Sequence, residues 1–301
     1  MKIAVVGLGH IGLPLAVQYA SRGHEVLGID VSRRIVDAIN RGESPHLDEQ
    51  TLIDRVPELH AAGRLRAATW DDSAAAGMRE AQTVVVIVPV VVDDRRQIDF
   101  RPIDAATRDI AQRIGPGTLV VYETTLPVGT TRDRFGPVLA EGSGLTLDRD
   151  LFLAFSPERV LVGRIFLDLQ RYPKIVGGTS EESTRRAVDF YRSVLDEGTE
   201  VWAVTNAETA EMTKLAETTY RDVNIAYANE LAQYARRRGI DVLEVIGAAN
   251  SQPYSHIHQP GVGVGGHCIP VYPHFLFNTD PSLRIPPLAR EINEEMAGWT
   301  V

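Results

Sequence analysis

A glycine motif directly behind the first apolar run limits what this chain can fold into. Residues Lys2–Val6 are apolar enough for a buried strand, and the sequence Gly-Leu-Gly-His-Ile-Gly follows at once as Gly7–Gly12. Leu13–Ser21 has the composition of a helix, and Glu25–Ile29 of a second strand that ends at Asp30. This order of strand, Gly-x-Gly-x-x-Gly turn, helix, strand and acid is typical of a dinucleotide-binding unit.

Each glycine of the motif has its own geometric task. Gly7 makes the tight turn, Gly9 lets the backbone approach a pyrophosphate, and Gly12 lets the helix pack closely on the strand. The helix start around His10 and Ile11 offers N–H donors and partial positive charge to phosphates. We therefore predict that these five residues bind a dinucleotide; the alternative is a glycine-rich turn without a ligand.

The acid at the end of the second strand decides between the two nicotinamide cofactors. Asp30 lies about 20 residues after the motif, where a carboxylate hydrogen-bonds the ribose 2′-hydroxyl and repels a 2′-phosphate. The sequence therefore predicts NAD. Arg33 and Arg34 lie close by and weaken the preference over NADP, and we count Arg34 among the cofactor-binding residues.

Strands and helices continue to alternate after this unit. Further strands are predicted at Thr83–Val88, Thr118–Tyr122, Leu151–Phe155, Lys174–Val176 and Glu200–Val204, and helices at Ile35–Asn40, Ile103–Ile114 and Glu182–Leu195. Such alternation is typical of a Rossmann-like, doubly wound parallel sheet, whose ligands bind beyond the carboxyl ends of the strands.

Three candidate groups follow strand ends of this kind. They are Thr125, Glu158 and the stretch after Pro89, and Pro89 and Thr125 are predicted to line the cofactor. Taken alone, Thr125 is more often a helix N-cap and Glu158 a solvated acid of a turn, so neither is specific without partners.

The alternation of strands and helices ends at Thr205. Residues 206–238 contain no glycine or proline and predict a helix of about 33 residues, roughly 50 Å long. A capping box with Thr205 at the N-cap and Glu208 three residues on would start it. We therefore expect an NAD-binding domain over 1–204 and a helical central domain over 205–301, with further helices at Val242–Ala248 and Leu288–Met296.

Lys214 and Thr218 share one face of the long helix, because they are four positions apart. The usual environment of such a lysine is a solvated surface. The single cysteine, Cys268, follows a glycine-rich stretch that includes Gly265, and the run Gly261–Pro270 suits a loop that a ligand approaches closely. The sequence predicts a nucleophile there, helped by His267, or else a buried structural cysteine.

Bulk properties exclude some partners. The net charge of −9 disfavours nucleic acid and anionic membranes, and no apolar run is long enough to span a bilayer. One cysteine allows no internal disulfide, and the chain opens directly into a strand without a signal peptide. We expect a cytoplasmic protein with no metal.

Taken together, these stretches resemble the nucleotide-sugar dehydrogenase family, which oxidises C6 of a UDP-sugar to a carboxylate. The matching stretches are Gly7–Gly12, Leu126–Thr131, Ser156–Leu161, Ala210–Glu217, Arg221–Ala226 and Gly261–Pro270. They cover the chain nearly end to end in the family's order. Their form is similar to the branch acting on UDP-N-acetylmannosamine or UDP-N-acetylglucosamine.

The resemblance implies a role for each candidate residue. Cys268 would add to an aldehyde and carry a thiohemiacetal and then a thioester between two hydride transfers to NAD. Glu158 and Thr125 would manage the hydrolytic water, and Lys214 would stabilise the oxyanion. An acid–base role fits Glu158 only if burial raises its pKa. The implied substrate-binding residues are Glu158, Arg159, Lys214, Thr218, Gly265 and Cys268.

The chain departs from the family's pattern at several positions. Tyr272 and Thr218 stand where an acid and an asparagine are usual, and Val90–Val92 replaces a hydroxyl-bearing stretch. The family also carries a third, UDP-binding domain, and this chain ends where it would begin, with Trp299 exposed unless something covers it. We therefore expect good NAD binding, weak UDP-sugar binding and slow or absent turnover.

Two alternatives compete with this dehydrogenase, and the departures support the first of them. One is a catalytically weak NAD- or nucleotide-binding fragment or paralogue. The other is a single-step dehydrogenase like the hydroxyacid group, which has no use for Cys268. In either case the long helix predicts a homodimer, because the remaining residues cannot cover it; Ile225, Tyr227 and Leu231 are candidates for that contact.

Overall fold

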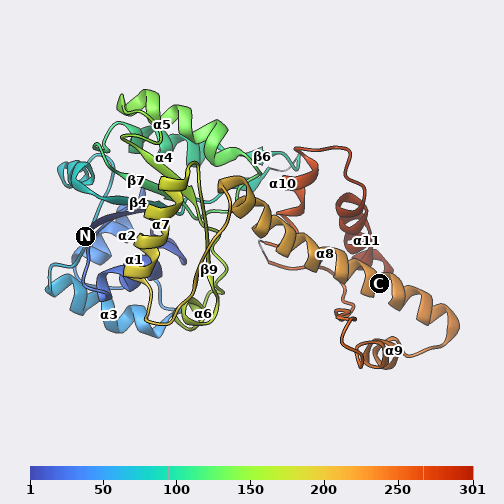
Figure 1. Ribbon diagram of the computed structural model, residues 1–301. Helices are drawn as coiled ribbons and strands as arrows, with labels where there is room; N and C mark the ends of the chain where they lie inside the picture. The colour runs from blue at the N-terminus through green and yellow to red at the C-terminus, as the bar shows by residue number, and fades with distance from the viewer. Residues whose placement is uncertain (94, 267, 301) are drawn as a thin grey trace. The chain divides into compact units, whose positions relative to one another are not determined.

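A computed structural model describes residues 1–93, 95–266 and 268–300. The chain forms two compact units (Figure 1). The first contains Met1–Val90 and Phe100–Glu211, and the second contains Val91–Asp99 and Met212–Val301.

The first unit alternates strands and helices as predicted. In chain order it contains β1 (Lys2–Val6), α1 (Gly12–Ser21), β2 (Glu25–Ile29), α2 (Arg33–Asn40), α3 (Gln50–Ala61), β3 (Leu65–Ala68), the 3-10 helix η1 (Ser73–Glu80), β4 (Thr83–Val86), α4 (Arg101–Ala111), β7 (Leu119–Tyr122), the π-helical turn η2 (Thr130–Phe135), α5 (Gly136–Ser143), β8 (Phe152–Phe155), α6 (Ile165–Arg171), β9 (Lys174–Gly178), α7 (Glu181–Val194) and β10 (Val201–Ala203). The sequence did not predict α3, β3, η1 and α6, which lie in stretches of mixed polarity.

The strands form one eight-stranded sheet in the order β10-β9-β8-β7-β4-β1-β2-β3. All neighbouring pairs are parallel except β8 and β9, where Phe155 lies opposite Gly177 in antiparallel register. The doubly wound sheet is therefore confirmed, with one reversal near its edge. Because β9 runs backwards, its first residue, Lys174, lies at the same edge as the carboxyl ends of β7 and β8.

Aromatic side chains fill both sides of the sheet. On one side, Tyr19 of α1 meets Phe190 of α7 edge to face, with ring centroids 5.5 Å apart. On the other, Tyr122 at the end of β7 stacks on Phe135 at 4.4 Å and pairs its hydroxyl with Thr107 of α4 at 2.7 Å. Figure 1 shows the covering helices on either side of the strands.

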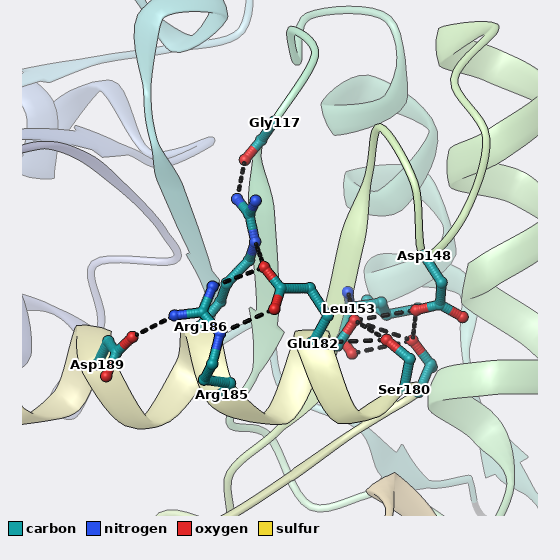
Figure 2. A network of polar contacts seen from close by, with 10 residues as sticks. Gly117, Asp148, Leu153, Ser180, Glu182, Arg185, Arg186 and Asp189 are labelled. Carbon is teal, nitrogen blue, oxygen red and sulfur yellow. Dashed lines mark hydrogen bonds and ion pairs between the residues drawn. The ribbon is translucent and has the colours of Figure 1, made fainter.

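Helix α7 is fixed at its amino end by polar contacts (Figure 2). The Ser180 hydroxyl caps it by accepting from the Ser183 N–H at 3.1 Å. Glu182 pairs with Arg186 at 2.7 Å, and Arg186 donates on to the carbonyl of Gly117 at 3.3 Å (Figure 2). These contacts hold α7 against the turn before β7, and α7 carries Tyr191 into the core.

Among its described residues, the second unit is helical apart from a small hairpin and the connecting loops. It contains β5 (Val91–Val92), β6 (Ile98–Asp99), most of α8 (Ala207–Arg238), α9 (Val242–Ala249), α10 (Pro273–Phe277) and α11 (Ile285–Thr300). The predicted helical character is confirmed, whereas the hairpin and α10 were not predicted. Helix α11 includes the two prolines expected to precede it, because proline is tolerated in a first helical turn.

The expected start of α8 was wrong in detail, whereas the expectation that Trp299 is exposed unless something covers it stands. Asn206, and not Thr205, caps α8, since its side-chain oxygen accepts from the Thr209 N–H at 2.9 Å. Asparagine is as strong an N-cap as threonine, so the sequence offered both. Trp299 is half-buried, and Arg236 lies over its ring at 5.0 Å from the centroid.

Candidate functional site

The glycine turn after β1 has the geometry of a phosphate cradle. Gly7 has φ 94°, and a Cβ there would lie 2.7 Å from the carbonyl oxygen of Ile87. A Cβ at Gly12 would lie 1.8 Å from the carbonyl oxygen of Gly7, whereas nothing lies within 4 Å of one at Gly9. Packing therefore requires glycine at Gly7 and Gly12. The space around Gly9 is open, so a pyrophosphate could approach the backbone there.

Asp30 is locked next to this turn by the backbone. Its carboxylate accepts from the Leu8 N–H at 2.7 Å and from the Ser32 N–H at 2.8 Å. Each oxygen keeps a free direction for a further donor, such as a ribose hydroxyl. The residues present therefore fit a dinucleotide.

The other predicted cofactor residues lie around the turn in different environments. His10 pairs with Asp48 at 2.9 Å, and its ring lies 4.4 Å from that of His46. Ile11 is half-buried against the core, while Arg34 and Pro89 are exposed. Val91 and Val92, in the stretch expected to have lost cofactor contacts, belong to the hairpin of the second unit.

A buried ionic cluster lies at the carboxyl ends of β7 and β8. The Lys174 ammonium donates to Glu123 at 2.7 Å and to Glu158 at 2.7 Å. The side chains are 6 %, 0 % and 12 % exposed, respectively. Glu123 and Lys174 were missed by the sequence analysis. Their signal was a charged residue directly after one apolar strand and at the start of another.

The remaining bonds of the cluster come from the first unit's own backbone and helices. Glu123 accepts from the Tyr19 hydroxyl at 3.1 Å and from the Tyr191 hydroxyl at 2.7 Å. Glu158 accepts from the N–H of Arg159 at 2.6 Å and of Val160 at 3.1 Å. Arg159 itself also donates to the carbonyl of Pro173.

The two carboxylates of the cluster differ in proton affinity. Burial, partly offset by Lys174, raises the pKa of Glu123 to about 7. Burial also acts on Glu158, but Lys174 and the hydrogen bonds from its neighbours outweigh it and lower the pKa of Glu158 to about 2. The condition for an acid–base role of Glu158, a raised pKa, is therefore not met: Glu158 is ionised and accepts hydrogen bonds.

Thr125 is buried in the segment that follows Glu123. It does not cap a helix, because the next helical turn begins at Thr130 with Gly129 at its N-cap. That turn is held by Glu211 at the root of α8, which accepts from the N–H of Gly129 at 2.6 Å and of Thr131 at 2.8 Å. Thr125 thus lies between Glu123, which the ionic cluster holds, and the turn that Glu211 holds.

In the second unit, Lys214 and Thr218 both lie on the buried side of α8, at 9 % and 4 % exposure. The Thr218 hydroxyl donates to the carbonyl of Lys214 at 3.0 Å, so it is turned back onto its own helix. Lys214 is therefore not the solvated surface charge that its position alone would suggest.

Cys268 is exposed, which removes the alternative of a buried structural cysteine. Its carbonyl accepts from the N–H of Tyr272 at 2.9 Å. Of the four described glycines of the loop, Gly266 alone has a positive φ, 87°, while a Cβ at Gly265 would meet nothing within 4 Å. His267, expected to lower the thiol pKa, lies outside the described residues.

Two asparagines of α8 anchor the approach to this loop. Asn224 accepts from the N–H of His258 at 2.9 Å, and Asn229 accepts from the N–H of Gly261 at 2.9 Å. Asn229 also donates to Asn293 of α11 at 2.8 Å. The sequence did not predict this function of the two residues, although amide side chains within an otherwise unbroken helix were a signal for it.

Comparison with known proteins identifies the class to which these features belong. The chain matches two domains of the UDP-glucose/GDP-mannose dehydrogenase family. Residues 1–195 match its NAD binding domain, and residues 208–295 match its central domain. The chain belongs to this family, and its cofactor is NAD. Its fold and its NAD-binding domain are those of an NAD-dependent UDP-sugar dehydrogenase.

Two curated relatives and one solved structure show which members of the family the chain is similar to. The chain is 39 % identical over 302 residues to the UDP-N-acetyl-D-mannosamine dehydrogenase of Pyrococcus horikoshii, covering 99 % of this chain and 69 % of that protein. It is 40 % identical to the NDP-N-acetyl-D-galactosaminuronic acid dehydrogenase of Ralstonia nicotianae, covering 97 % and 68 %. The solved structure of the Pyrococcus horikoshii UDP-D-ManNAc dehydrogenase matches with a TM-score of 0.91 at 37 % identity, covering 99 % and 69 %.

No helix within the described residues combines the length and apolar character that crossing a bilayer requires.

Proposed function

We propose that this protein oxidises C6 of a UDP-N-acetylhexosamine, with UDP-N-acetylmannosamine first and UDP-N-acetylglucosamine second among the candidates. The relatives named for N-acetylated sugars support the substrate class. The observation that carries the proposal is the exposed thiol of Cys268 behind a glycine-rich loop, in a chain with a dinucleotide turn at Gly7–Gly12.

The proposed chemistry gives each residue a defined task. NAD, when bound, supplies the hydride acceptor. After the alcohol has become an aldehyde, the Cys268 thiolate adds to the carbonyl carbon, and the thiohemiacetal loses a second hydride to become a thioester. Water then breaks the C–S bond, which releases the carboxylate and restores the thiol. Lys214 stabilises the developing oxyanion as a fixed cation.

The cluster at β7 and β8 refines the proposed part of Glu158. An ionised carboxylate with a low pKa is a poor proton acceptor but a good hydrogen-bond acceptor. We assign Glu158 to holding the hydrolytic water, with Thr125 as a second contact. For the sugar nucleotide we retain Arg159, Thr218 and Gly265 as proposed contacts, and for NAD we retain Gly7, Gly9, His10, Ile11, Gly12, Asp30, Arg34, Pro89 and Thr125.

The test uses the lone cysteine. Purified chain is incubated with NAD and each of a panel of UDP-sugars, and reduced nicotinamide and sugar acid are measured separately. We expect Cys268→Ser to abolish acid formation, because a hydroxyl ionises far less than a thiol near neutral pH. Ser255→Ala, a change at another loop position of the second unit, serves as the matched control. Unchanged acid formation by the Cys268 variant would make the cysteine structural.

One observation favours a second candidate, a catalytically weak NAD- or nucleotide-binding protein. Thr218 stands where the family uses an asparagine, and its hydroxyl is spent on the carbonyl of Lys214. Oxyanion stabilisation would then rest on Lys214 alone. Thr218→Asn decides between the two candidates, since it should raise acid formation if the threonine limits the enzyme and change nothing if the protein only binds.

We also propose a homodimer built on α8. Tyr220, Tyr227 and Tyr234 recur every seven residues along one face and are each more than half exposed, whereas the predicted Ile225 and Leu231 are half-buried. We expect Tyr227→Glu to convert a dimer into a monomer in light scattering, with Leu47→Glu as the exposed control. A wild-type chain that is already monomeric at micromolar concentration contradicts the proposal.

The functional division that we propose is an NAD-binding domain over 1–204 and a central domain over 205–301. The proposed compartment is the cytoplasm, which the unpaired thiol of Cys268 supports.

A further inference from the structure

The cluster of Glu123, Lys174 and Glu158 contains more than the proposed reaction uses. Two carboxylates share a single ammonium, and two tyrosine hydroxyls bond the deeper carboxylate from behind. Buried charges are costly unless they are paired and hydrogen-bonded, and here every one is. A structural ion pair would need one carboxylate only, so the second one requires a reason.

We propose that Lys174 and Glu123 are positioning residues for Glu158: Lys174 holds it ionised and in one orientation from the inner side of the sheet, and Glu123 sets the strength of that contact through its own protonation. The inference rests on the function proposed for Glu158. It adds two residues, neither of them assigned a part in the chemistry so far, that act through Glu158 and contact no substrate.

Geometry shows how the hold works. The N–H of Glu158 donates to the carbonyl of Glu123 at 3.4 Å, so the two acids leave adjacent strands side by side. Lys174 reaches both because β9 runs antiparallel to β8 and starts at that edge. One oxygen of Glu158 is fixed by Lys174 and the other by the backbone N–H groups of Arg159 and Val160. Rotation of this carboxylate would break one of these bonds.

Charge balance shows which acid responds to pH. With all three groups ionised, the cluster carries one negative charge in excess, and a single proton on one carboxylate removes it. Glu123 is that carboxylate, because it is fully buried while Glu158 keeps some contact with solvent. The groups that face Glu123 are Lys174 of β9, Tyr19 of α1, Tyr191 of α7 and Glu158. Its pKa, raised by burial to about 7, agrees.

As a consequence, the strength of the ion pair between Lys174 and Glu158 changes near neutral pH. When Glu123 is protonated, the Lys174 ammonium is opposed by Glu158 alone and binds it more strongly. When Glu123 is ionised, the two carboxylates compete for one ammonium. Tyr19 lies on α1, the helix that follows the dinucleotide turn, so the same cluster also contacts the cofactor helix.

The first experiment is independent of activity. The full chain is labelled with ¹³C at glutamate side-chain carboxyls and titrated by NMR. We expect one carboxyl to titrate near pH 7 and to vanish in Glu123→Gln, and a second one, lost in Glu158→Gln, to stay ionised far below the usual range. Persistence of the neutral titration in Glu123→Gln overturns the inference.

Lysine variants test the hold itself. Lys174→Met should raise the titration midpoint of Glu158, and Lys174→Arg should restore most of the original value. Lys2→Met is the matched control, because Lys2 pairs with Glu80 on the surface. An unchanged Glu158 midpoint in Lys174→Met would overturn the positioning role even if the variant folds well.

Activity then separates this inference from the proposed function. Where the chain oxidises a UDP-sugar, Lys174→Met should lower kcat at least about tenfold with little change in KM, because misplacing a catalytic group costs rate more than binding. Glu123→Gln should remove the limb near pH 7 from the kcat profile, while Glu182→Gln, at an exposed ion pair, should keep it. Correct titrations with an unmoved kcat profile overturn the link to catalysis, and correct titrations without any turnover count against the proposed function instead.

Discussion

Each compact unit of this protein buries an ionic cluster, and the two clusters are built differently. In the first unit, Lys174 serves two carboxylates, so the charges do not cancel. In the second, Asp222 pairs with Arg290 at 2.7 Å, Arg290 reaches Glu294 at 3.5 Å, and Glu294 pairs with Arg96 at 2.6 Å. Two acids and two bases alternate there, and the charges cancel.

The difference separates a group that can titrate from one that only supports the fold. The row of alternating charges in the second unit links α8, α11 and the hairpin. Side-chain exposure increases along it from the buried Asp222 to the half-exposed Arg96. Nothing in it gains from taking up a proton at neutral pH. In the first unit a proton removes the excess charge, so that cluster can respond to conditions in which the enzyme works.

The largest effect is expected for Lys174→Met. At pH 8 it leaves two buried carboxylates opposed, and we expect a loss of about 3–5 kcal/mol in the free energy of unfolding. The loss should shrink toward pH 6, because a proton shared between Glu123 and Glu158 can replace the ammonium. Urea unfolding at several pH values measures it, with Lys2→Met expected to cost less than about 1 kcal/mol. A loss that is the same at pH 6 and 8 would contradict the comparison.

A smaller effect without pH dependence is expected for Asp222→Asn in the balanced cluster. Asparagine keeps the size and the contact with Asn293, which donates to Asp222 at 2.8 Å, but leaves Arg290 with Glu294 alone. We expect a cost of about 2–3 kcal/mol at both pH 6 and pH 8. If the cost varies with pH as it does for Lys174→Met, the two clusters are not different in kind.

The two units should also lose stability at opposite ends of the pH range. Glu123 has a raised pKa of about 7 in the folded state, so its contribution to stability is complete below the unfolded value near 4.5 and is lost as pH rises through 7. Glu123→Gln should therefore become more stable relative to wild type as pH rises over this interval. Parallel unfolding curves of the two proteins from pH 5 to 8 would show that Glu123 does not titrate there.

His274 gives the matching, smaller effect in the second unit. Burial and the nearby Arg96 and Arg290 lower the pKa of His274 to about 4, so its contribution is complete above the unfolded value near 6.5 and is lost as pH falls through 4. His274→Phe keeps the contact with Phe277, whose ring lies 4.6 Å away, and removes the titration. Thermal unfolding between pH 4 and 7 should fall less steeply in the variant; an identical fall excludes His274 as the cause.

Most of the first unit could be predicted from sequence because its strands are short apolar runs bounded by glycine or proline. The dinucleotide turn was equally readable, since Gly7 and Gly12 are fixed by steric contact and leave a spacing that can be recognised. The stretches that were missed, such as α3 and β3, have mixed polarity and depend on tertiary packing.

The cluster behind Glu158 could not be predicted for a topological reason. Lys174 approaches Glu158 only because β9 is antiparallel to β8, and an apolar run does not reveal its direction in a sheet. The low pKa of Glu158 follows from that same reversal, so the sequence could give the condition for an acid–base role, a raised pKa, but could not show that the condition fails.

The close fit of Gly177 against the root of α8 limits how the sequence can drift. A Cβ at Gly177 would lie 2.0 Å from the carbonyl oxygen of Asn206, which is backbone and cannot rotate away. Any side chain at this position fits only if the start of α8 moves. A substitution at Gly177 is therefore expected to be tolerated only together with a change that moves the start of α8.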